Sequence, residues 1–284
     1  MILAIDATNI RDGGGVTHLT ELLKEFNPSV HHFSKIVVWA GMNTLNKIEN
    51  SKYIEKRNHP FLDKSIFFRL IWQRYYFRKE LSKLKPDVVF VPGSMHFLKL
   101  RSVVTMSQNM LPFIKEERRR YAWTYTFFRL WLLEKQQAKS FVNSDGVIFL
   151  SSYARDFIQP YLKKKSPSSQ IIAHGISQQF FAKVKEQKDI SKYSCEDPFK
   201  ILYVSTIDAY KHQVNLIPVI CRLFNEGFPL RLTLVGGGHG AELDKLREVI
   251  SFCFREQEEM IFFRDTAAIK RCRWIKNYLR FLHF

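Results

Sequence analysis

Three consecutive glycines, Gly13, Gly14 and Gly15, stand between an apolar run at residues 2–6 and an amphipathic stretch that begins at residue 16. Glycine permits a close approach of the backbone to a ligand, and the free N–H groups at the start of a helix attract phosphate. We therefore expect a phosphate-binding loop at this place. A tight turn that binds no ligand would give the same pattern.

A second glycine run, residues 236–238, again follows an apolar run and precedes a helical stretch. Two such loops indicate a bound diphosphate more strongly than either alone, although a turn explains this one too. Lys211 lies at the expected start of another helix, where a cation is unfavourable unless it serves a ligand. It would neutralise a departing phosphate as a point charge; the alternative is a solvated lysine.

Polar residues also end two other apolar runs. Gln108 and Asn109 follow residues 103–106 and could hydrogen-bond a sugar, or simply cap the next helix. His174 and Gly175 follow residues 171–173, and a lone histidine is more often structural than catalytic. Glu248 and Glu256, with seven residues between them, fall in one helical stretch and are interpreted as solvated helix positions.

The elements that must position these residues alternate along the chain. Short apolar runs typical of strands buried on both faces occupy residues 2–6, 36–39, 88–91, 103–106, 147–150 and 171–173. Helical stretches lie between them at residues 16–26, 64–84, 114–140 and 152–164. This alternation predicts an α/β fold with a doubly wound parallel sheet.

The pattern restarts after a polar linker at residues 183–198. Strands are expected at residues 201–205, 231–235 and 260–263, with helices at residues 212–226 and 240–255. We expect a complete first domain at residues 1–182 and a partial second domain at residues 199–284. The second has about three strands, where a full doubly wound domain has about six.

The composition limits the classes of function. The net charge of +17 favours anionic partners, and 46% hydrophobic residues exclude wholesale disorder. The four cysteines have no zinc-ligand spacing and predict free thiols in a reducing compartment. Since Asp6 interrupts the first apolar run and no apolar run is long enough to span a membrane, we expect a cytoplasmic protein, soluble or lying on a membrane surface. The tail, residues 267–284, is either a basic amphipathic helix or out-of-frame translation.

Six segments together resemble glycosyltransferase family 4, also called group 1. In chain order they are IDATNIRDGGGVTHLTELL, VVTMSQNMLPF, VIFLSSYARDFI, IIAHGISQQFF, ILYVSTIDAYKHQVNLI and LRLTLVGGG. The resemblance implies a GT-B fold, in which two Rossmann-like domains face a cleft, here with the second domain incomplete. It also implies that a sugar moves from a nucleotide-sugar donor to a glycan or lipid-linked acceptor, with retention of anomeric configuration and without a metal or cofactor.

The resemblance also implies roles for particular residues. Gly14 and Gly15 match a glycine loop near the donor phosphates and the acceptor, and Gly175 matches the glycine of a turn that leaves the first domain. Lys211 matches a lysine that contacts the diphosphate, and Gly237 a glycine near the nucleotide. Gln108 and Asn109 stand where many members place a histidine and an aspartate or asparagine beside the transferred sugar.

Three departures from the family leave alternatives open. Thr206 replaces an arginine that many members have, Gln108 replaces the histidine, and the expected pair of glutamates separated by seven residues would lie beyond residue 284. The chain could therefore be an inactive, truncated remnant of such an enzyme. A basic nucleic-acid-binding protein is a further alternative, although we expect no specific nucleic acid because no binding motif is present.

The sequence also suggests a peripheral contact with a membrane. A lipid-linked acceptor, as used in surface-polysaccharide assembly, suits a basic stretch that carries Trp123, Phe127, Phe128 and Trp131. A helix packed in the core of the first domain is the alternative for this stretch.

Overall fold

The computed structural model describes residues 1–162, 167–176, 181, 184, 186–238 and 240–253, and the backbone of residues 261–264. The chain divides into two compact units, Met1–His174 (unit 1) and Gly175–Phe284 (unit 2). Glu256, the tail at residues 267–284 and part of the linker at residues 183–198 lie outside the described residues.

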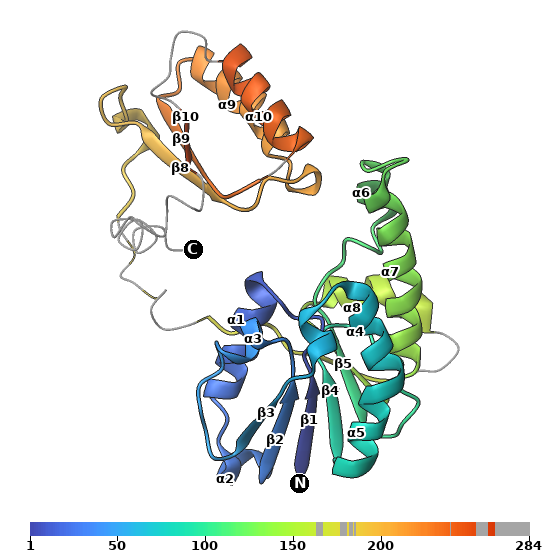
Figure 1. Cartoon of the computed structure of the whole chain (residues 1–284). Helices are drawn as coiled ribbons and strands as arrows, with labels where there is room; N and C mark the ends of the chain where they lie inside the picture. The colour runs from blue at the N-terminus through green and yellow to red at the C-terminus, as the bar shows by residue number, and fades with distance from the viewer. Residues whose placement is uncertain are drawn as a thin grey trace. The chain divides into compact units, whose positions relative to one another are not determined.

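Unit 1 is built on a parallel sheet of seven strands in the order β3-β2-β1-β4-β5-β6-β7 (Figure 1). Across the sheet the strand numbers fall from β3 to β1 and then rise from β4 to β7, so the strand order reverses between β1 and β4. β1 pairs in parallel with both β2 and β4. The strands are β1 (Ile2–Asp6), β2 (Lys35–Trp39), β3 (Ile54–Arg57), β4 (Val88–Val91), β5 (Val103–Ser107), β6 (Gly146–Phe149) and β7 (Ser168–Ile171).

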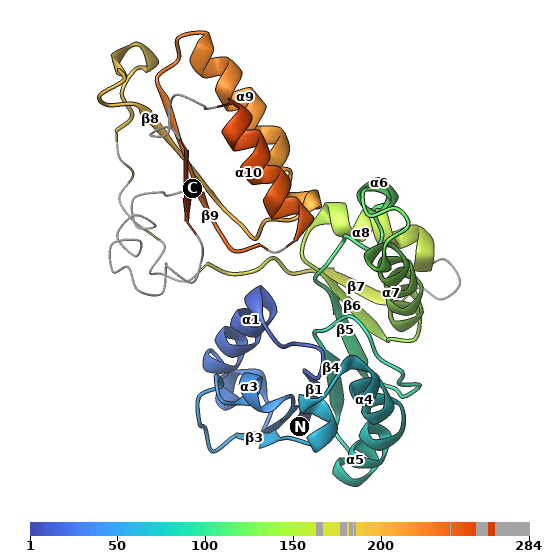
Figure 2. The ribbon, with the colours of Figure 1, turned by 45° about the horizontal axis from the view of Figure 1, so that its top comes forward.

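Helices cover both faces of this sheet (Figure 2). One face carries α1 (Gly13–Lys24) and α3 (Met42–Leu45), and the other carries α4 (Ile66–Ile71) and α5 (Phe77–Leu84). A π-helical turn, Trp72–Tyr76, joins α4 to α5. The remaining helices are α2 (Pro28–His31), α6 (Lys115–Arg119), α7 (Tyr125–Val142) and α8 (Ser152–Ile158).

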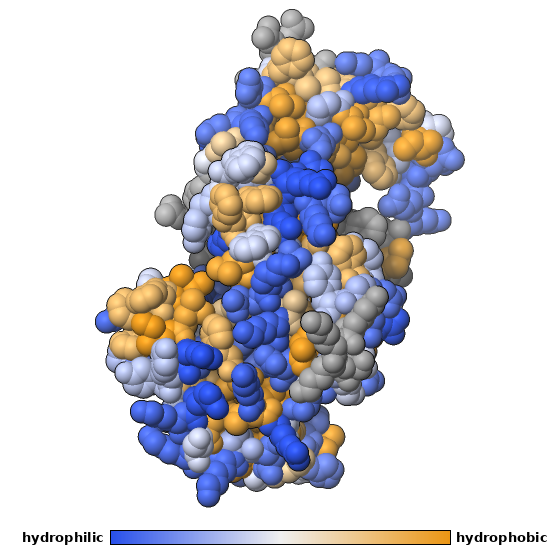
Figure 3. All heavy atoms as spheres, turned by 90° about the vertical axis from the view of Figure 1, so that its right-hand side faces the viewer, coloured by the Kyte–Doolittle hydropathy of each residue, from blue (hydrophilic) through white to orange (hydrophobic). Residues whose placement is uncertain are grey.

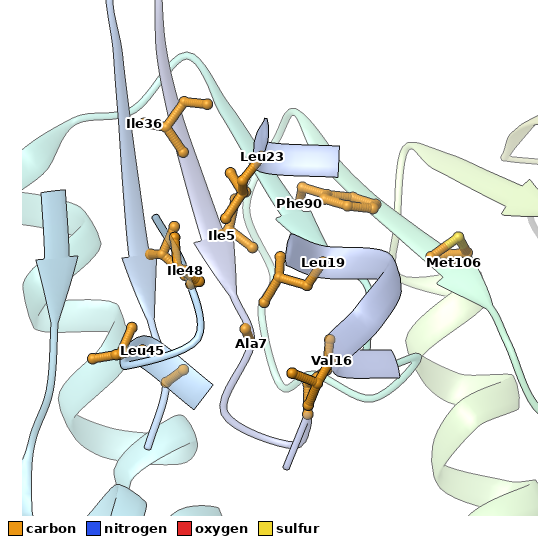
Figure 4. Packing of buried hydrophobic residues seen from close by; sticks show 13 residues of the cluster. Ile5, Ala7, Val16, Leu19, Leu23, Ile36, Leu45, Ile48, Phe90 and Met106 are labelled. Carbon is orange, nitrogen blue, oxygen red and sulfur yellow. The ribbon is translucent and has the colours of Figure 1, made fainter. Parts of the chain in front are cut away.

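The core of unit 1 follows from the two-residue period of its strands. Ile5 of β1 and Phe90 of β4 lie on the α1 side, where Leu19 of α1 packs against the sheet (Figure 4). The neighbouring residues Ala4 and Val89 lie on the opposite side with Trp72 and Phe77. Burial on both faces explains why the central strands are almost wholly apolar.

Unit 2 contains a parallel sheet in the order β10-β9-β8 among its described residues. Its strands are β8 (Phe199–Val204), β9 (Leu230–Val235) and β10 (Ile261–Arg264), and its helices are α9 (Gln213–Asn225) and α10 (Ala241–Cys253). Ile217 of α9, Leu232 of β9 and Leu246 of α10 are wholly buried in one cluster. This agrees with the second α/β unit expected from the sequence.

The sequence predicted the central strands well and the edge strands poorly. β3 was not expected, because Glu55, Lys56 and Arg57 give it a polar sequence, and β7 begins at Ser168 rather than at residue 171. Both are edge strands of the sheet. Strands were predicted from continuous apolar runs, which are typical of strands that have neighbours on both sides and helices over both faces. An edge strand lacks this full burial and needs no such run.

The helix predicted at residues 114–140 is in fact two helices. The chain turns between α6 and α7, where Trp123 adopts a left-handed conformation with φ of 61° and Thr124 caps α7. A buried ion pair joins the two helices, because the Arg118 guanidinium donates to the Glu134 carboxylate. The Tyr161 hydroxyl donates to the same carboxylate over 3.1 Å, so the buried charges are hydrogen-bonded, as burial requires.

His96, in the segment between β4 and β5, is a second buried polar group. Its Nδ1 accepts from the Leu98 backbone N–H at 3.2 Å, so Nε2 carries the proton and donates to the Ser144 hydroxyl at 2.9 Å. The Ser144 hydroxyl in turn donates to the Ser140 carbonyl. Burial lowers the pKa of His96 to about 4, so the ring is neutral at physiological pH.

This pKa predicts a pH-dependent stability. The unfolded His96 binds a proton below about pH 6.5, whereas the folded ring resists protonation until about pH 4, so stability is lost as the pH falls through this interval. We expect a loss of about 3 kcal/mol from this group, at about 1.4 kcal/mol per pKa unit. Urea unfolding from pH 7 to pH 4 should show a shallower decline for His96→Gln than for the wild type. Equal slopes for the two proteins would contradict the assignment.

Candidate functional site

The loops that follow β1, β4 and β5 meet at the carboxyl edge of the unit 1 sheet. A Cβ placed on Gly93 would lie 3.3 Å from the Asn9 Cβ, and one placed on Gly15 would lie 3.5 Å from Gln108 Oε1. The Gln108 N–H also lies 3.5 Å from the Ser94 hydroxyl oxygen. The strand order reverses between β1 and β4, and open α/β sheets bind ligands at such a point.

The buried side chain of Asp6, at the carboxyl end of β1, fixes these loops through its hydrogen bonds. Its carboxylate is 2% exposed and accepts from the Thr8 backbone N–H at 3.1 Å, the Thr8 hydroxyl at 2.6 Å and Gln73 Nε2 at 2.9 Å. Burial raises the pKa of this carboxyl, and the bonds from Thr8 and Gln73 act in the opposite direction. Gln73 comes from the π-helical turn, a feature that is frequent at functional sites.

The first glycine run forms the start of α1. Gly13 has φ of +65°, which a side chain would strain, and Gly14 is exposed in the first turn. Asp12 occupies the N-cap position but its side chain makes no capping hydrogen bond. The first-turn N–H groups are therefore not capped by that residue, and such groups attract an anion.

Gln108 and Asn109 have different surroundings although they are adjacent. The Nε2 of Gln108 is buried and has no hydrogen-bond partner, which is a costly state for an amide donor. Asn109 is exposed, and its Oδ1 accepts from the Leu111 N–H at 3.0 Å. The structure thus brings Gln108 beside the glycine loop and gives Asn109 a local turn-forming contact.

His174 packs against a histidine that the sequence did not single out. The rings of His18, on α1, and His174 lie with their centroids 4.4 Å apart. Burial lowers the pKa of His18, and the charge of His174 lowers it further. The adjoining Gly175 is exposed, and a Cβ there would meet no atom within 4 Å, so its surroundings impose no steric need for glycine.

Lys211 lies in unit 2, in a short 3-10 turn immediately before α9. Its Nζ lies 4.8 Å from the centroid of the Tyr210 ring, and its carbonyl accepts from the Tyr203 hydroxyl at 2.5 Å. The turn follows the carboxyl end of β8, the sheet edge at which such folds bind ligands.

The glycines after β9 are required by a close approach of two loops. A Cβ on Gly236 would lie 1.7 Å from the Ser205 carbonyl oxygen, and one on Gly238 would lie 2.7 Å from the Ile207 Cβ. The Ile207 N–H donates to the Gly237 carbonyl at 3.0 Å and holds the loops together. Packing therefore explains two of the three glycines, and the nucleotide contact of Gly237 stays a prediction.

Known structures share this fold. Sucrose-phosphate synthase from Thermosynechococcus elongatus matches with a TM-score of 0.63 and 14% identity, over 93% of this chain and 70% of that one. WaaG, a glycosyltransferase involved in lipopolysaccharide biosynthesis, matches with a TM-score of 0.55 and 12% identity, over 93% and 70%. Anabaena HepE, in complex with UDP and glucose, matches with 0.54 and 13%, over 93% and 69%. No protein-family model and no curated protein matches the sequence.

The chain has the GT-B fold. At this level of identity the match shows the fold alone, and the chain spans about 70% of the length of these glycosyltransferases. The fold class predicted from the six segments is confirmed; membership of family 4 in particular stays a prediction.

Three residues of the unit 1 site were missed by sequence reasoning. Asp6 gave a usable signal, because it is a carboxylate directly at the end of an apolar strand. Gln73 and Arg69 gave none, because they lie inside the apolar and basic pattern of a long helix, more than sixty residues from Asp6 and Thr8. Only the packing of that helix against the sheet brings them to the β1 loop.

The N-terminal part of α7 and the turn before it expose several large apolar side chains. Trp123 is 90% exposed and Tyr125 78%, while the other face of α7 buries Leu130 and Phe141. Figure 3 shows patches of hydrophobic residues among hydrophilic ones on this side of the molecule. We call this set the α7 aromatic surface: Trp123, Tyr125, Phe128, Trp131 and Leu132. Among the described residues, no helix is long and apolar enough to cross a membrane.

The loop contact in unit 2 gives a direct test. Gly236→Ala would force a methyl group into the Ser205 carbonyl, so we expect unit 2 to lose more than about 3 kcal/mol of stability. Hydrogen exchange of α9 and β9 amides measures this loss separately from unit 1. Gly175→Ala is the matched control, because a Cβ there meets nothing within 4 Å. Unchanged exchange in Gly236→Ala would show that the two loops are not in contact.

Proposed function

We propose that this chain is a glycosyltransferase that moves a sugar from a nucleotide-sugar donor to an acceptor. The observation that carries the proposal is the GT-B fold, shared with sucrose-phosphate synthase and WaaG. The matching structure of Anabaena HepE contains UDP and glucose, which supports a nucleotide-sugar as the donor. The positions of the glycine loops and of Lys211, at the carboxyl edges of two parallel sheets, are those of a ligand site in this class of fold.

In the proposal, unit 2 holds the donor. Lys211 offsets the charge of the diphosphate, the N–H groups at the start of α9 add to this effect, and Gly237 lies near the nucleotide. These groups would supply the positive charge that a metal supplies in other transferases, so we propose a reaction without a metal. Gly14, Gly15, Gly175, Gln108 and Asn109 are proposed contacts to the donor phosphates, transferred sugar and acceptor.

The proposed reaction is a simple group transfer. The bond between the anomeric carbon and the diphosphate oxygen breaks, and a bond to an acceptor hydroxyl oxygen forms on the same face of the sugar. The hydroxyl proton leaves with the diphosphate. The unpaired Gln108 Nε2 is a donor available to a sugar hydroxyl or a developing charge near the β5 loop.

The acceptor is proposed to be a glycan or a lipid-linked sugar, reached from a membrane surface. The α7 aromatic surface combines exposed Trp and Phe side chains with the exposed basic residues Arg119, Arg129 and Lys135. Aromatic rings enter the headgroup region of a bilayer, and basic side chains are attracted to anionic lipids. These features support a peripheral contact with an anionic membrane.

Donor binding is the first test of the proposal. Calorimetry with UDP- and GDP-sugars should detect binding to the wild type, and Lys211→Met should weaken it at least about tenfold, because a charge-assisted contact to the diphosphate is lost. Lys245→Met on α10, where Lys245 pairs with Glu242, removes the same charge outside the site and should leave affinity unchanged.

The result separates the active enzyme from its inactive alternative. Binding with turnover of a lipid-linked or glycan acceptor supports the transferase, whereas binding without turnover supports a remnant that keeps the donor site. A folded chain that binds neither nucleotide-sugar would contradict the proposal.

Membrane contact is tested on the α7 aromatic surface. The double variant Trp123→Ser, Trp131→Ser should bind several-fold more weakly to vesicles that contain anionic lipid, measured by cosedimentation, because two interfacial rings are removed. Phe252→Ser, an exposed aromatic residue on α10, is the matched control. Equal binding of the double variant and the wild type would exclude this surface as the contact.

A further inference from the structure

Two arginines, Arg69 and Arg11, lie at the loop that follows β1. Arg69 reaches the loop from α4, and its Nη1 makes only long contacts, 3.4 Å to the Thr8 carbonyl and 3.5 Å to Asn9 Oδ1. Arg11, at the end of the loop, donates to the Lys64 carbonyl at 3.2 Å. Within the described part of the chain, neither guanidinium forms an ion pair.

The arrangement is costly without a ligand. The Nε of Arg69 is buried and has no hydrogen-bond partner, and a buried, unsatisfied donor on a charged group loses much of its solvation. Burial lowers the pKa of Arg69, and the charge of Arg11 lowers it further, which is the sign of two like charges in proximity. Lys64 contributes only its carbonyl to Arg11, because its Nζ lies over the Phe68 ring, 5.0 Å from the centroid.

The contacts of Arg69 lead to the loops that follow β1, β4 and β5. Asn9, which Arg69 contacts, approaches Gly93, and the neighbouring Ser94 lies beside Gln108. Gln108 in turn adjoins Gly15 at the start of α1. The arginines, the first turn of α1, which Asp12 does not cap, and the unpaired Gln108 amide thus border one stretch of chain, residues 9–15, and all carry hydrogen-bond donors.

We propose that Arg11 and Arg69 form a subsite in unit 1 for a phosphate group. A phosphomonoester carries nearly two negative charges near pH 7, which matches two guanidiniums, and the planar guanidinium donates to phosphate oxygens in pairs. The assignment of this phosphate group to the acceptor rests on the proposed transferase function, whereas the anion site itself does not. A soluble sugar phosphate and a phosphorylated lipid carry the same recognised group.

The test measures phosphate binding to the full chain without any nucleotide-sugar. Inorganic phosphate should raise the unfolding temperature at constant ionic strength, since a ligand that binds the folded state stabilises it. Arg69→Met and Arg11→Met should each weaken phosphate binding at least about tenfold in calorimetry. Arg78→Met, an exposed arginine on α5, should not change it. Arg11→Met keeps the test valid if Arg69→Met fails to fold.

The outcomes are distinguishable from those of the donor experiment. No phosphate binding by the wild type, or an equal loss in Arg78→Met, overturns the subsite whatever happens with UDP- and GDP-sugars. Phosphate binding that depends on Arg11 and Arg69 in a chain without donor binding supports the subsite and contradicts the transferase. A sugar monophosphate and a short-chain phosphatidic acid below its micellar concentration, tested separately, show which source of phosphate is preferred.

Discussion

A buried carboxylate governs the geometry of unit 1. Asp6 ends the central strand in a place that water does not reach, so its oxygens must be satisfied by the protein, and Thr8 and Gln73 satisfy them. Thr8 sets the path of the loop that leads to the first glycine run. Gln73 ties that loop to the π-helical turn, and therefore to α4, which brings Arg69 beside the loop. One buried carboxyl group thus joins elements that are more than sixty residues apart in the chain.

The two glycine runs show that one sequence pattern can have two physical causes. Gly14 faces open space, so its lack of a side chain leaves the start of α1 accessible to a ligand. Gly236 and Gly238 instead face the loop after β8, and any side chain there would collide with it. Both runs follow a strand and precede a helix, as the sequence suggested. Their different surroundings appear only when the neighbouring chain segments are seen.

How much of the structure the sequence predicts also depends on whether a feature has a local cause or depends on neighbouring segments. Strands with two covered faces, such as β1 and β4, are apolar along their length and were predicted to the residue. The edge strands β3 and β7 and the break between α6 and α7 were not, because they depend on neighbours that no local pattern records. Gln108 was singled out because it directly follows a strand, and Lys211 because a lysine stands at an expected helix start. Arg69 and Gln73 were not, because a helix supplies them from the side.

The positively charged residues of the two units can be considered separately. A net charge of +17 suggests only a general attraction to anions, and exposed lysines and arginines spread along the chain would give the same value. The structure separates from this background two places where cations stand at the carboxyl edge of a parallel sheet: Lys211 in unit 2, and Arg11 with Arg69 in unit 1. In the proposed transfer, the donor diphosphate and a phosphorylated acceptor would each pair with one of these sets of cations. Since the two sets belong to different units, substitution of one set leaves the cations of the other in place, so that nucleotide-sugar binding and phosphate binding can be altered one at a time.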